Sequence, residues 1–250
     1  MKGYKKLIAF GDEHLPTAHA ARLRILLDVI EYEKPDIIIS GGDMINCDCL
    51  SDYSKTHDKL VGLQKELKQA HAWIESINKV APKAEKVLLE DNHFFRRLAD
   101  KMTREHWLSD LEDMKPENQL KLNKYGWTAQ SEYNYKDVLL IMHGDGSGGS
   151  SANPVNQARK DANKYGITVV RFHSHCTGFE LHKNYNGEVG AIQLGTFEDA
   201  QKAGYIKHGG LNNWTTSFGL FYLSETAKEF FFVPSYFIND KCVLNGRLYK

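Results

Sequence analysis

The sequence predicts an α/β fold in which two packed β-sheets are flanked by helices. Over the first part of the chain, short apolar, β-prone runs alternate with longer stretches of helical periodicity, which is the pattern of parallel strands joined by crossover helices. Beyond Gly178, short apolar runs alternate with turns, which indicates antiparallel strands. Because no linker composition separates the two parts and no internal repeat is present, we expect one domain over residues 1–250.

The first strands and helices follow from residue spacing. The run KKLIAF predicts a strand over 5–10, and Leu, Ile and Val at helical spacing predict a helix over 17–32 that a Lys-Pro-Asp sequence ends. The apolar run at 36–40 is typical of a parallel strand buried on both faces. A helix over 57–79 follows, since its leucines and isoleucines form one apolar face opposite Lys, Gln and Glu.

Later elements continue the alternation. A strand is expected over 86–89 and a helix over 93–110, whereas segment 112–134 is polar and irregular, either a surface excursion or a lid. The remaining elements of this part are a strand over 137–142, a loop rich in glycine and serine over 144–153, a helix over 154–164 and a strand over 167–172. Beyond them, Asn-Gly pairs at 186–187 and 245–246 separate apolar runs and so predict β-hairpins.

The composition is that of a globular protein, with 42% hydrophobic and 26% charged residues. The 32 basic and 32 acidic residues balance, which excludes the overall basic field of a tight, non-specific nucleic-acid binder but not a local patch. The apolar run near the start is too short for a signal-peptide core, and no run approaches a membrane span. We therefore expect a cytoplasmic protein (in the host cytoplasm if a phage encodes it), with no membrane contact and no obligate protein partner.

Five short polar blocks stand out because most of them directly follow an apolar, β-prone run. They contain, in chain order, Asp12 and His14, Asp43, Asn92 and His93, His143, and His173 and His175. In an open α/β sheet, the loops beyond the carboxyl ends of the strands converge on one crevice. Carboxylate, amide and imidazole groups are metal ligands, so the sequence predicts a metal site at the C-terminal edge of the strands.

Spacing within the blocks supports this prediction. Asp12 and His14 are two residues apart, as are His173 and His175, and alternate residues of an extended segment point the same way. A carboxylate such as Asp43 can bridge two cations. Each residue alone has an ordinary structural role, a helix cap or a packed side chain, but their joint occurrence at five strand ends favours two divalent ions. Mn is preferred, and Fe, Zn and Ni are compatible with the same donors.

The cysteines give a weaker signal. Cys47 and Cys49 follow Asp43 closely, and they either add a soft metal ligand or simply line a loop. With Cys176 and Cys242 they form no CxxC pair and no dense framework. We therefore expect reduced thiols.

Taken in order, the blocks GDEH, GGDMIN, DNH, HGD and HSH resemble the calcineurin-like metallophosphoesterase superfamily. The family pattern is GDxH, GDxx(D/N), GNH(D/E), a later His followed by Gly, and GHxH. The similarity runs from residue 6 to about 222 and is strongest to compact, uncapped members of phage or bacterial type. It implies a four-layer α/β/β/α sandwich of two mixed β-sheets flanked by helices, with the metal site at the strand C-terminal edge.

The resemblance also implies a role for each matching residue. One metal is held by Asp12, His14 and His175, the second by Asn92, His143 and His173, and Asp43 bridges both. His93 takes the place of the catalytic histidine that contacts the phosphate and can protonate the leaving oxygen. Arg96 and Arg97 follow it, and either can fork onto a substrate phosphate or lie on a solvated helix face; we count Arg96 with His93 and Asp43 as catalytic.

Three positions depart from the family pattern. Asp91 replaces the usual Gly before Asn92, where it either crowds the turn or adds a carboxylate near the phosphate. Phe94 replaces the acidic residue after the catalytic histidine, which puts the orientation of that histidine in question. Phe172 replaces the Gly before His173. None of these changes removes a metal ligand.

The function implied is a dinuclear metal-dependent phosphoesterase that hydrolyses phosphate esters by attack of a metal-bridged hydroxide. A bound metal ion lowers the pKa of the water that it coordinates from 15.7 to about 7. The expected substrate is a phosphodiester of nucleic acid or a nucleotide, since no cap domain is evident. Two alternatives stay open: a phosphomonoesterase acting on phosphoproteins or small molecules, and a metal-stabilised scaffold without catalysis.

Several other residues have two readings. Asp145 either orients His143 or is a turn residue, and His208 either reaches the site or lies in a surface loop. Trp214 and the phenylalanines at 230–232 are interpreted as core residues rather than stacking platforms. The loop at 144–153 lacks the Gly-Lys-Ser/Thr of a phosphate-binding P-loop.

Overall fold

Two β-sheets form the centre of this computed structural model, which describes residues 3–52, 61–147, 153–185, 187–203 and 213–250. The first sheet has, in spatial order, β11 (Phe230–Tyr236), β10 (Ser217–Ser224), β1 (Tyr4–Phe10), β2 (Ile37–Ser40), β3 (Glu85–Leu89) and β4 (Thr128–Gln130). The second sheet has β5 (Glu132–Tyr135), β6 (Leu139–Met142), β7 (Thr168–Arg171), β9 (Gly187–Gln193) and β8 (Gly178–Asn184). Both sheets mix parallel and antiparallel pairs.

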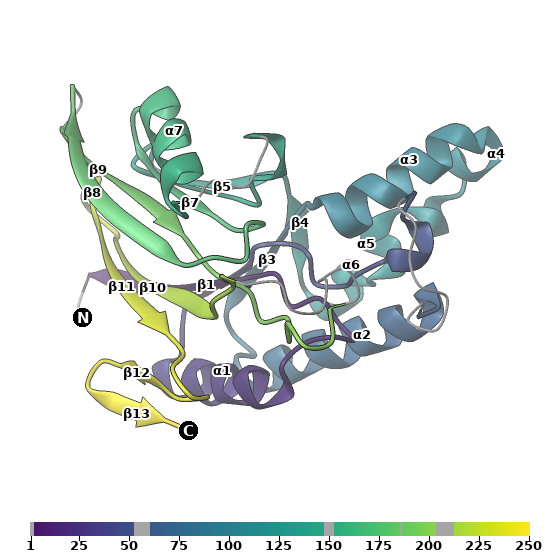
Figure 1. Cartoon of the computed structure of the whole chain (residues 1–250), viewed down its shortest axis with the longest axis horizontal. Helices are drawn as coiled ribbons and strands as arrows, with labels where there is room; N and C mark the ends of the chain where they lie inside the picture. The colour runs from purple at the N-terminus through teal and green to yellow at the C-terminus, as the bar shows by residue number, and fades with distance from the viewer. Residues whose placement is uncertain (1–2, 53–60, 148–152, 186, 204–212) are drawn as a thin grey trace.

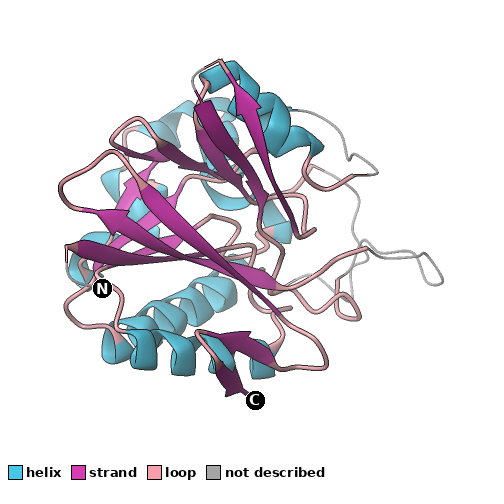
Figure 2. Cartoon of the chain, turned by 90° about the vertical axis from the view of Figure 1, so that its left-hand side faces the viewer, coloured by secondary structure: helices cyan, strands magenta, loops and turns pink. Residues whose placement is uncertain are grey.

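Helices cover the outer face of each sheet. Figure 1 shows α1 (Ala20–Glu33) and α2 (Leu63–Val80) against the first sheet, and α7 (Asn156–Tyr165) against the second. Turned on its side, the molecule shows the four layers in sequence, helix, sheet, sheet and helix (Figure 2). The predicted fold class, a four-layer α/β/β/α sandwich of two mixed sheets, is confirmed.

Alternation along the buried strands explains this layering. On β1, Ile8 and Phe10 join the core formed with α1 and α2. Their neighbours Leu7 and Ala9 join a second core, which lies between the sheets and includes residues of β6 and β7. Both faces of the strand are therefore buried, and this is why its sequence reads as an uninterrupted apolar run.

Most predicted elements occur within a few residues of their expected bounds. The strands predicted over 5–10, 36–40, 86–89, 137–142 and 167–172 are β1, β2, β3, β6 and β7. The helices predicted over 17–32 and 154–164 are α1 and α7, and the one predicted over 57–79 is α2, although residues 53–60 lie outside the described part. Both hairpin pairings are confirmed, β8 with β9 and β12 (Cys242–Leu244) with β13 (Arg247–Tyr249), although Asn186 lies outside the described residues.

The prediction of one helix over 93–110 is wrong. The chain first makes a wide π-type turn over Asn92–Arg96, with the Arg96 amide donating to the Asp91 carbonyl at 3.1 Å. Helix α3 (Arg97–Arg104) follows, and the non-helical backbone of Glu105 separates it from α4 (His106–Ser109). Helices α3 and α4 extend away from the sheets as an arm (Figure 1).

The prediction that segment 112–134 is irregular is also wrong. After a short 3₁₀ turn (Glu112–Met114) it forms the helices α5 (Pro116–Gln119) and α6 (Leu122–Tyr125). It then supplies β4 to the edge of the first sheet and β5 to the edge of the second. The end of this segment therefore joins the two sheets rather than covering a site.

The antiparallel second part of the chain is confirmed with one exception. Strands β8 and β9 pair antiparallel, as do β10 and β11. Strand β9, however, also pairs parallel with β7. No helix in the described ranges is long and apolar enough to cross a membrane.

Candidate metal centre

The five polar blocks meet at one edge of the sandwich. Three of them follow β1, β2 and β3 of the first sheet, and two follow β6 and β7 of the second. Parallel strands end at the same edge, so their loops converge there. The seven residues expected to bind metal all lie in this region, and both sheets contribute to it.

A first cluster consists of Asp12, His14, Asp43 and His175, all buried. Each offers one ligand atom, and these atoms lie within 4.8 Å of one another. The Nε2 atoms of His14 and His175 are 2.9 Å apart. The His14 Nε2 atom is also 3.7 Å from the Asp43 Oδ2 atom. These four ligand atoms are close enough together for a single ion to contact all of them.

A second cluster consists of Asp43, His143 and His173, whose ligand atoms also lie within 4.8 Å of one another. The His143 Nε2 atom is 3.4 Å from Asp43 Oδ2 and 2.9 Å from the Asn92 Oδ1 atom. Asn92 therefore adds an amide oxygen to this group. Asp43 is common to both clusters, and its position is the one expected of a carboxylate between two ions.

The residues present fit a pair of divalent cations. Asp12 Oδ1 and the Nδ1 atoms of His173 and His175 are buried without a hydrogen-bond partner, and each unpaired buried polar atom costs about 1–3 kcal/mol. The facing Nε2 atoms of His14 and His175 can share only one proton between them. A cation would satisfy Asp12 Oδ1 and would separate the two facing Nε2 atoms, and imidazole, carboxylate and amide groups suit Mn, Fe, Zn or Ni.

Five of the candidate metal ligands have a left-handed backbone conformation. Asp12, His14, Asp43, His173 and His175 have φ values of 53°, 51°, 51°, 71° and 61°. This left-handed region costs roughly 1–2 kcal/mol for a residue with a Cβ atom. Asp12 and His14 do point toward the same cluster, but the prediction that their segment is extended is wrong. Left-handed turns aim both side chains at the cluster, and such strain gathers at functional sites.

Hydrogen bonds fix two of the imidazole rings. His14 donates from Nδ1 to the Asn46 Oδ1 atom at 2.8 Å, and Asn46 donates to Thr17 Oγ1 at 2.9 Å. His143 donates from Nδ1 to the Gly41 carbonyl at 2.8 Å. With Nδ1 held as the donor, each ring directs its Nε2 to the cluster, and the neutral ring in this tautomer is the form that binds metal.

The charges within the cluster interact strongly. Burial would raise the pKa of Asp43, but the adjacent His93 and His143 outweigh it and hold the pKa well below its usual range. Burial raises the pKa of Asp12 to about 8. Burial opposes protonation of His143, yet Asp43 and Asp12 raise its pKa to about 10. Metal ions would take the place of these protons, since only the deprotonated side chains coordinate.

His93 lies beside the clusters with its ring held in place. Its Nδ1 atom is 3.0 Å from the Asn46 carbonyl oxygen, and its Nε2 atom is 3.8 Å from Asp43 Oδ2. Its side chain is 14% exposed, so one edge reaches solvent. Burial lowers the pKa of His93 to about 3, so the ring is neutral near pH 7 in the absence of a bound anion.

The departure at Asp91 has a structural explanation. Its carboxylate accepts hydrogen bonds from the Phe94 amide at 2.7 Å and the Phe95 amide at 3.2 Å, and so caps the wide turn that carries His93. Its other oxygen accepts from the Asp43 amide at 2.8 Å. Asp91 is 6% exposed. It ties two site loops together and caps the turn rather than crowding it.

The two phenylalanine departures are core residues. Phe94 is buried against Phe95, and the Asn46 carbonyl orients His93 instead of an acidic residue. Phe172 is fully buried between the sheets. A Cβ atom at Gly41 would lie 2.2 Å from its ring, and one at Gly11 2.9 Å. The ring thus fills the space that two glycines leave open.

Arg96, Arg97 and Asp145 lie at the mouth of the centre. Arg96 is largely exposed, and its NH1 atom is 3.0 Å from Asp145 Oδ2. Arg97 is mostly buried and donates to the Asn46 carbonyl at 2.6 Å. Asp145 does not orient His143, because the Gly41 carbonyl occupies the Nδ1 position of that ring.

Three residues near the centre were missed by sequence reasoning or assigned differently. Asn46 contacts both His14 and His93, and the family pattern of its block was the only signal for it. Glu198 is buried, accepts from Thr17 at 2.8 Å and lies 3.9 Å from His175 Nδ1. Trp214, expected in the core, is half-buried with its ring centroid 4.2 Å from that of His175.

The other sequence candidates do not join the site. His208 and residues 148–152 lie outside the described part of the chain. The clusters found within that part contain no cysteine, although Cys47 is buried nearby. Of the phenylalanines at 230–232, interpreted as core residues, Phe231 is exposed and the other two are half-buried.

No protein-family model matches the chain, and no curated protein matches it in sequence. Among solved structures, it is similar to Vps29 from Chaetomium thermophilum, with a TM-score of 0.49, 10% identity and coverage of 98% of both chains. It is also similar to zinc-complexed Vps29 from Entamoeba histolytica, with a TM-score of 0.48, 11% identity and coverage of 95% and 96%. A third similar structure, YfcE, a phosphoesterase from E. coli, has a TM-score of 0.39, 16% identity and coverage of 91% and 98%.

Proposed function

We propose that this chain is a dinuclear metal-dependent phosphoesterase that hydrolyses a phosphodiester of nucleic acid or a nucleotide. The observation that carries the proposal is Asp43, a buried carboxylate shared by two groups of metal-ligand side chains. The residues that resemble the calcineurin-like metallophosphoesterases are the ones that form these groups. A shared carboxylate serves chemistry in which two ions act on one phosphate.

The ligand sets follow from the two clusters. Asp12, His14 and His175 would hold one ion, and Asn92, His143 and His173 the other, with Asp43 between them. When bound, such ions supply a nucleophilic water-derived oxygen at neutral pH and neutralise charge on the phosphate. Asn46 and the Gly41 carbonyl keep His14 and His143 in the ligating tautomer.

His93 is the proposed proton donor to the leaving oxygen. Its Nε2 atom faces the centre, while its Nδ1 atom is held by the Asn46 carbonyl. Burial keeps the ring neutral when no substrate is present, because it lowers the pKa of His93 to about 3. A phosphate anion beside the ring would favour the protonated form. General acid catalysis of this kind contributes roughly 10²–10⁴-fold to the rate.

The mouth of the centre supports a diester substrate. Arg96 stands over it with most of its side chain in solvent and can turn from Asp145 to a phosphate oxygen. No additional domain covers the mouth in the described ranges. A substrate that continues on both sides of its phosphate therefore has room to bind.

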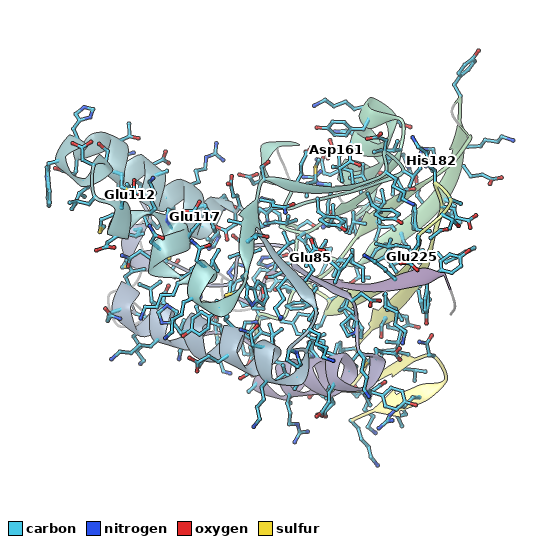
Figure 3. All side chains as sticks on the ribbon, turned by 180° about the vertical axis from the view of Figure 1, so that it is seen from behind. Glu85, Glu112, Glu117, Asp161, His182 and Glu225 are labelled. Carbon is cyan, nitrogen blue, oxygen red and sulfur yellow. The ribbon has the colours of Figure 1, made fainter. Side chains whose placement is uncertain are left out.

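Hydrolysis of chromogenic esters tests the proposal. Bis-p-nitrophenyl phosphate and p-nitrophenyl phosphate are compared with Mn²⁺ and with EDTA, for the wild type and for His93→Ala. We expect the diester to be preferred, EDTA to abolish turnover, and His93→Ala to lower kcat by about 10²–10⁴-fold with both ions retained. His182→Ala, on β8 and away from the centre (Figure 3), is the matched histidine control.

The other outcomes identify the alternatives. Preference for the monoester would make the chain a phosphomonoesterase. Two bound metals without turnover of either ester would make it a scaffold. Loss of metal from His93→Ala would contradict the role given to His93.

A further inference from the structure

A cavity of about 340 Å³ lies directly beside the proposed metal centre. One side of it is the loop after β2, with Leu50, Ser51 and Asp52, and the other is the start of α3. Asn92, which contacts His143 in the second cluster, also lines it. The cavity therefore adjoins the metal centre, and the proposed hydrolysis uses only Asn92 and Arg96 of its lining.

Three cationic side chains and Asp100 share one face of α3, and Arg97, Asp100 and Lys101 line this cavity. Arg97, Lys101 and Arg104 are spaced four and three residues apart, so they lie on the same face of the helix. Arg97 is nearest the metal centre, fixed by its hydrogen bond to the Asn46 carbonyl at 2.6 Å. Arg104 is farthest along the arm. The cations thus form a line that starts at the centre and leads outward.

The two outer cations pair with one carboxylate, Asp52, and a second carboxylate, Asp100, also lines the cavity. Asp52 is 2.7 Å from the Lys101 Nζ atom and 2.8 Å from the Arg104 NH2 atom. Its side chain is 56% exposed, and exposed ion pairs contribute little to stability. The cavity lining has three cationic side chains, Arg96, Arg97 and Lys101, and two carboxylates, Asp52 and Asp100, so one positive charge is in surplus. An incoming anion can therefore replace Asp52 at small cost.

We propose that this cavity binds a second phosphate of the substrate, the one next to the phosphate that is hydrolysed. The proposal rests on the proposed function and narrows it to substrates with at least two phosphates. Lys101 and Arg104 would contact the second phosphate, and Leu50 offers an apolar wall to the group attached to it. A nucleic-acid strand and a nucleoside polyphosphate share this chemistry.

A purely structural role for the same residues has a different consequence. If the ion pairs served only to hold α3 against the loop after β2, their removal would alter stability but not ligand choice. Binding to a phosphate instead makes affinity depend on salt, because each cation that contacts a phosphate releases a counterion.

Binding of a fluorescein-labelled six-nucleotide oligothymidylate in EDTA tests the proposal without any turnover. The wild type is compared with Lys101→Gln/Arg104→Gln by fluorescence anisotropy over a range of salt concentrations. We expect the double variant to raise Kd at least tenfold, since two charge-assisted contacts are lost. The slope of log Kd against log salt should fall by about 0.7 for each cation removed.

The matched control is Lys115→Gln. Lys115 pairs with Glu112 at 2.8 Å on the more distant part of the arm (Figure 3), so its removal also breaks an exposed ion pair. Its Kd and salt slope should equal those of the wild type. Thermal unfolding of all variants shows whether they are folded, and Lys101→Arg, which keeps the charge, should retain binding. Equal Kd values for wild type and double variant, or equal losses with Lys115→Gln, would overturn the proposal.

Competition separates the two sources of the second phosphate. Displacement of the labelled strand by ATP but not by AMP supports a polyphosphate, and displacement only by unlabelled oligonucleotide supports a strand. Displacement by AMP as readily as by ATP would overturn the need for two phosphates.

A kinetic comparison keeps this proposal distinct from the proposed function. The ratio of kcat/KM for the dinucleotide pTpT to that for bis-p-nitrophenyl phosphate should fall about tenfold in the double variant. If the double variant is active and this ratio of kcat/KM values is unchanged, the second-phosphate site is refuted and the proposed function is not. If the wild type binds the oligonucleotide through Lys101 but hydrolyses no ester, the proposed function is refuted and the second-phosphate site is not.

Discussion

Phe172 and Gly41 form a steric pair whose coupling can be measured. A Cβ atom at Gly41 would lie 2.2 Å from the Phe172 ring, far inside van der Waals contact. Gly41→Ala must therefore displace the ring or the strand end, and we expect the free energy of unfolding to fall by about 1–3 kcal/mol. Phe172→Ala empties the space of a fully buried ring and should lower it by about 3–5 kcal/mol.

In the double variant, the new methyl group occupies space that the ring has vacated. The two losses should then not add, and the coupling free energy should be about 1–3 kcal/mol. Urea unfolding of the four proteins in EDTA, followed by circular dichroism, gives this value. Gly62→Ala is the control, because a Cβ atom there meets nothing within 4 Å and should show no coupling to Phe172. Strictly additive losses for Gly41 and Phe172 would refute the reasoning.

Three further perturbations have defined outcomes. Asp91→Ala removes the acceptor of the Phe94 and Asp43 amides. In urea unfolding, the free energy of unfolding should fall by about 1–2 kcal/mol. An unchanged midpoint would mean that water replaces the cap. Glu198→Gln replaces the carboxylate beside His175 by a neutral amide. Isothermal titration calorimetry should show Mn²⁺ affinity reduced about 10–100-fold. An unaltered Kd would exclude a role for Glu198 in positioning the His175 ring. Removing metal with EDTA should lower Tm, since metal at 1,000 times its Kd adds about 4.1 kcal/mol, and a Tm independent of metal would count against a built site.

The sequence predicted the strands that are buried on both faces. On β1 and β2 the residues of the two cores form the apolar runs 7–10 and 37–39, which are long enough to recognise. Strands β4 and β5 were missed because they are short, polar edge strands whose burial is only partial. Their positions depend on partners far away in the sequence, and no local pattern records this.

The candidate site shows a similar division. The residue types and their order in the sequence predicted that Asp12, Asp43 and His175 lie together, and their ligand atoms are within 4.8 Å of one another in the structure. The left-handed backbone that aims them could not be read from the sequence, because neither Asp nor His signals it as Gly would. Glu198 belongs to no motif block, and only the folded chain brings it to His175.

The break between α3 and α4 was equally invisible. Neither Gly nor Pro stands at Glu105, where the helix ends. The apolar positions of the predicted helix continued through this point, so periodicity favoured one long helix. The cationic face of α3 became apparent only with the bounds of that helix and the position of Asp52.

Because the candidate ligands follow strands of both sheets, bound cations would link the two sheets to each other. A small slide of one sheet past the other would pull the two halves of the coordination apart. The packing between the two sheets would thus keep the two groups of metal-ligand side chains together. Substitutions there should be tolerated far less readily than equally buried ones under the outer helices.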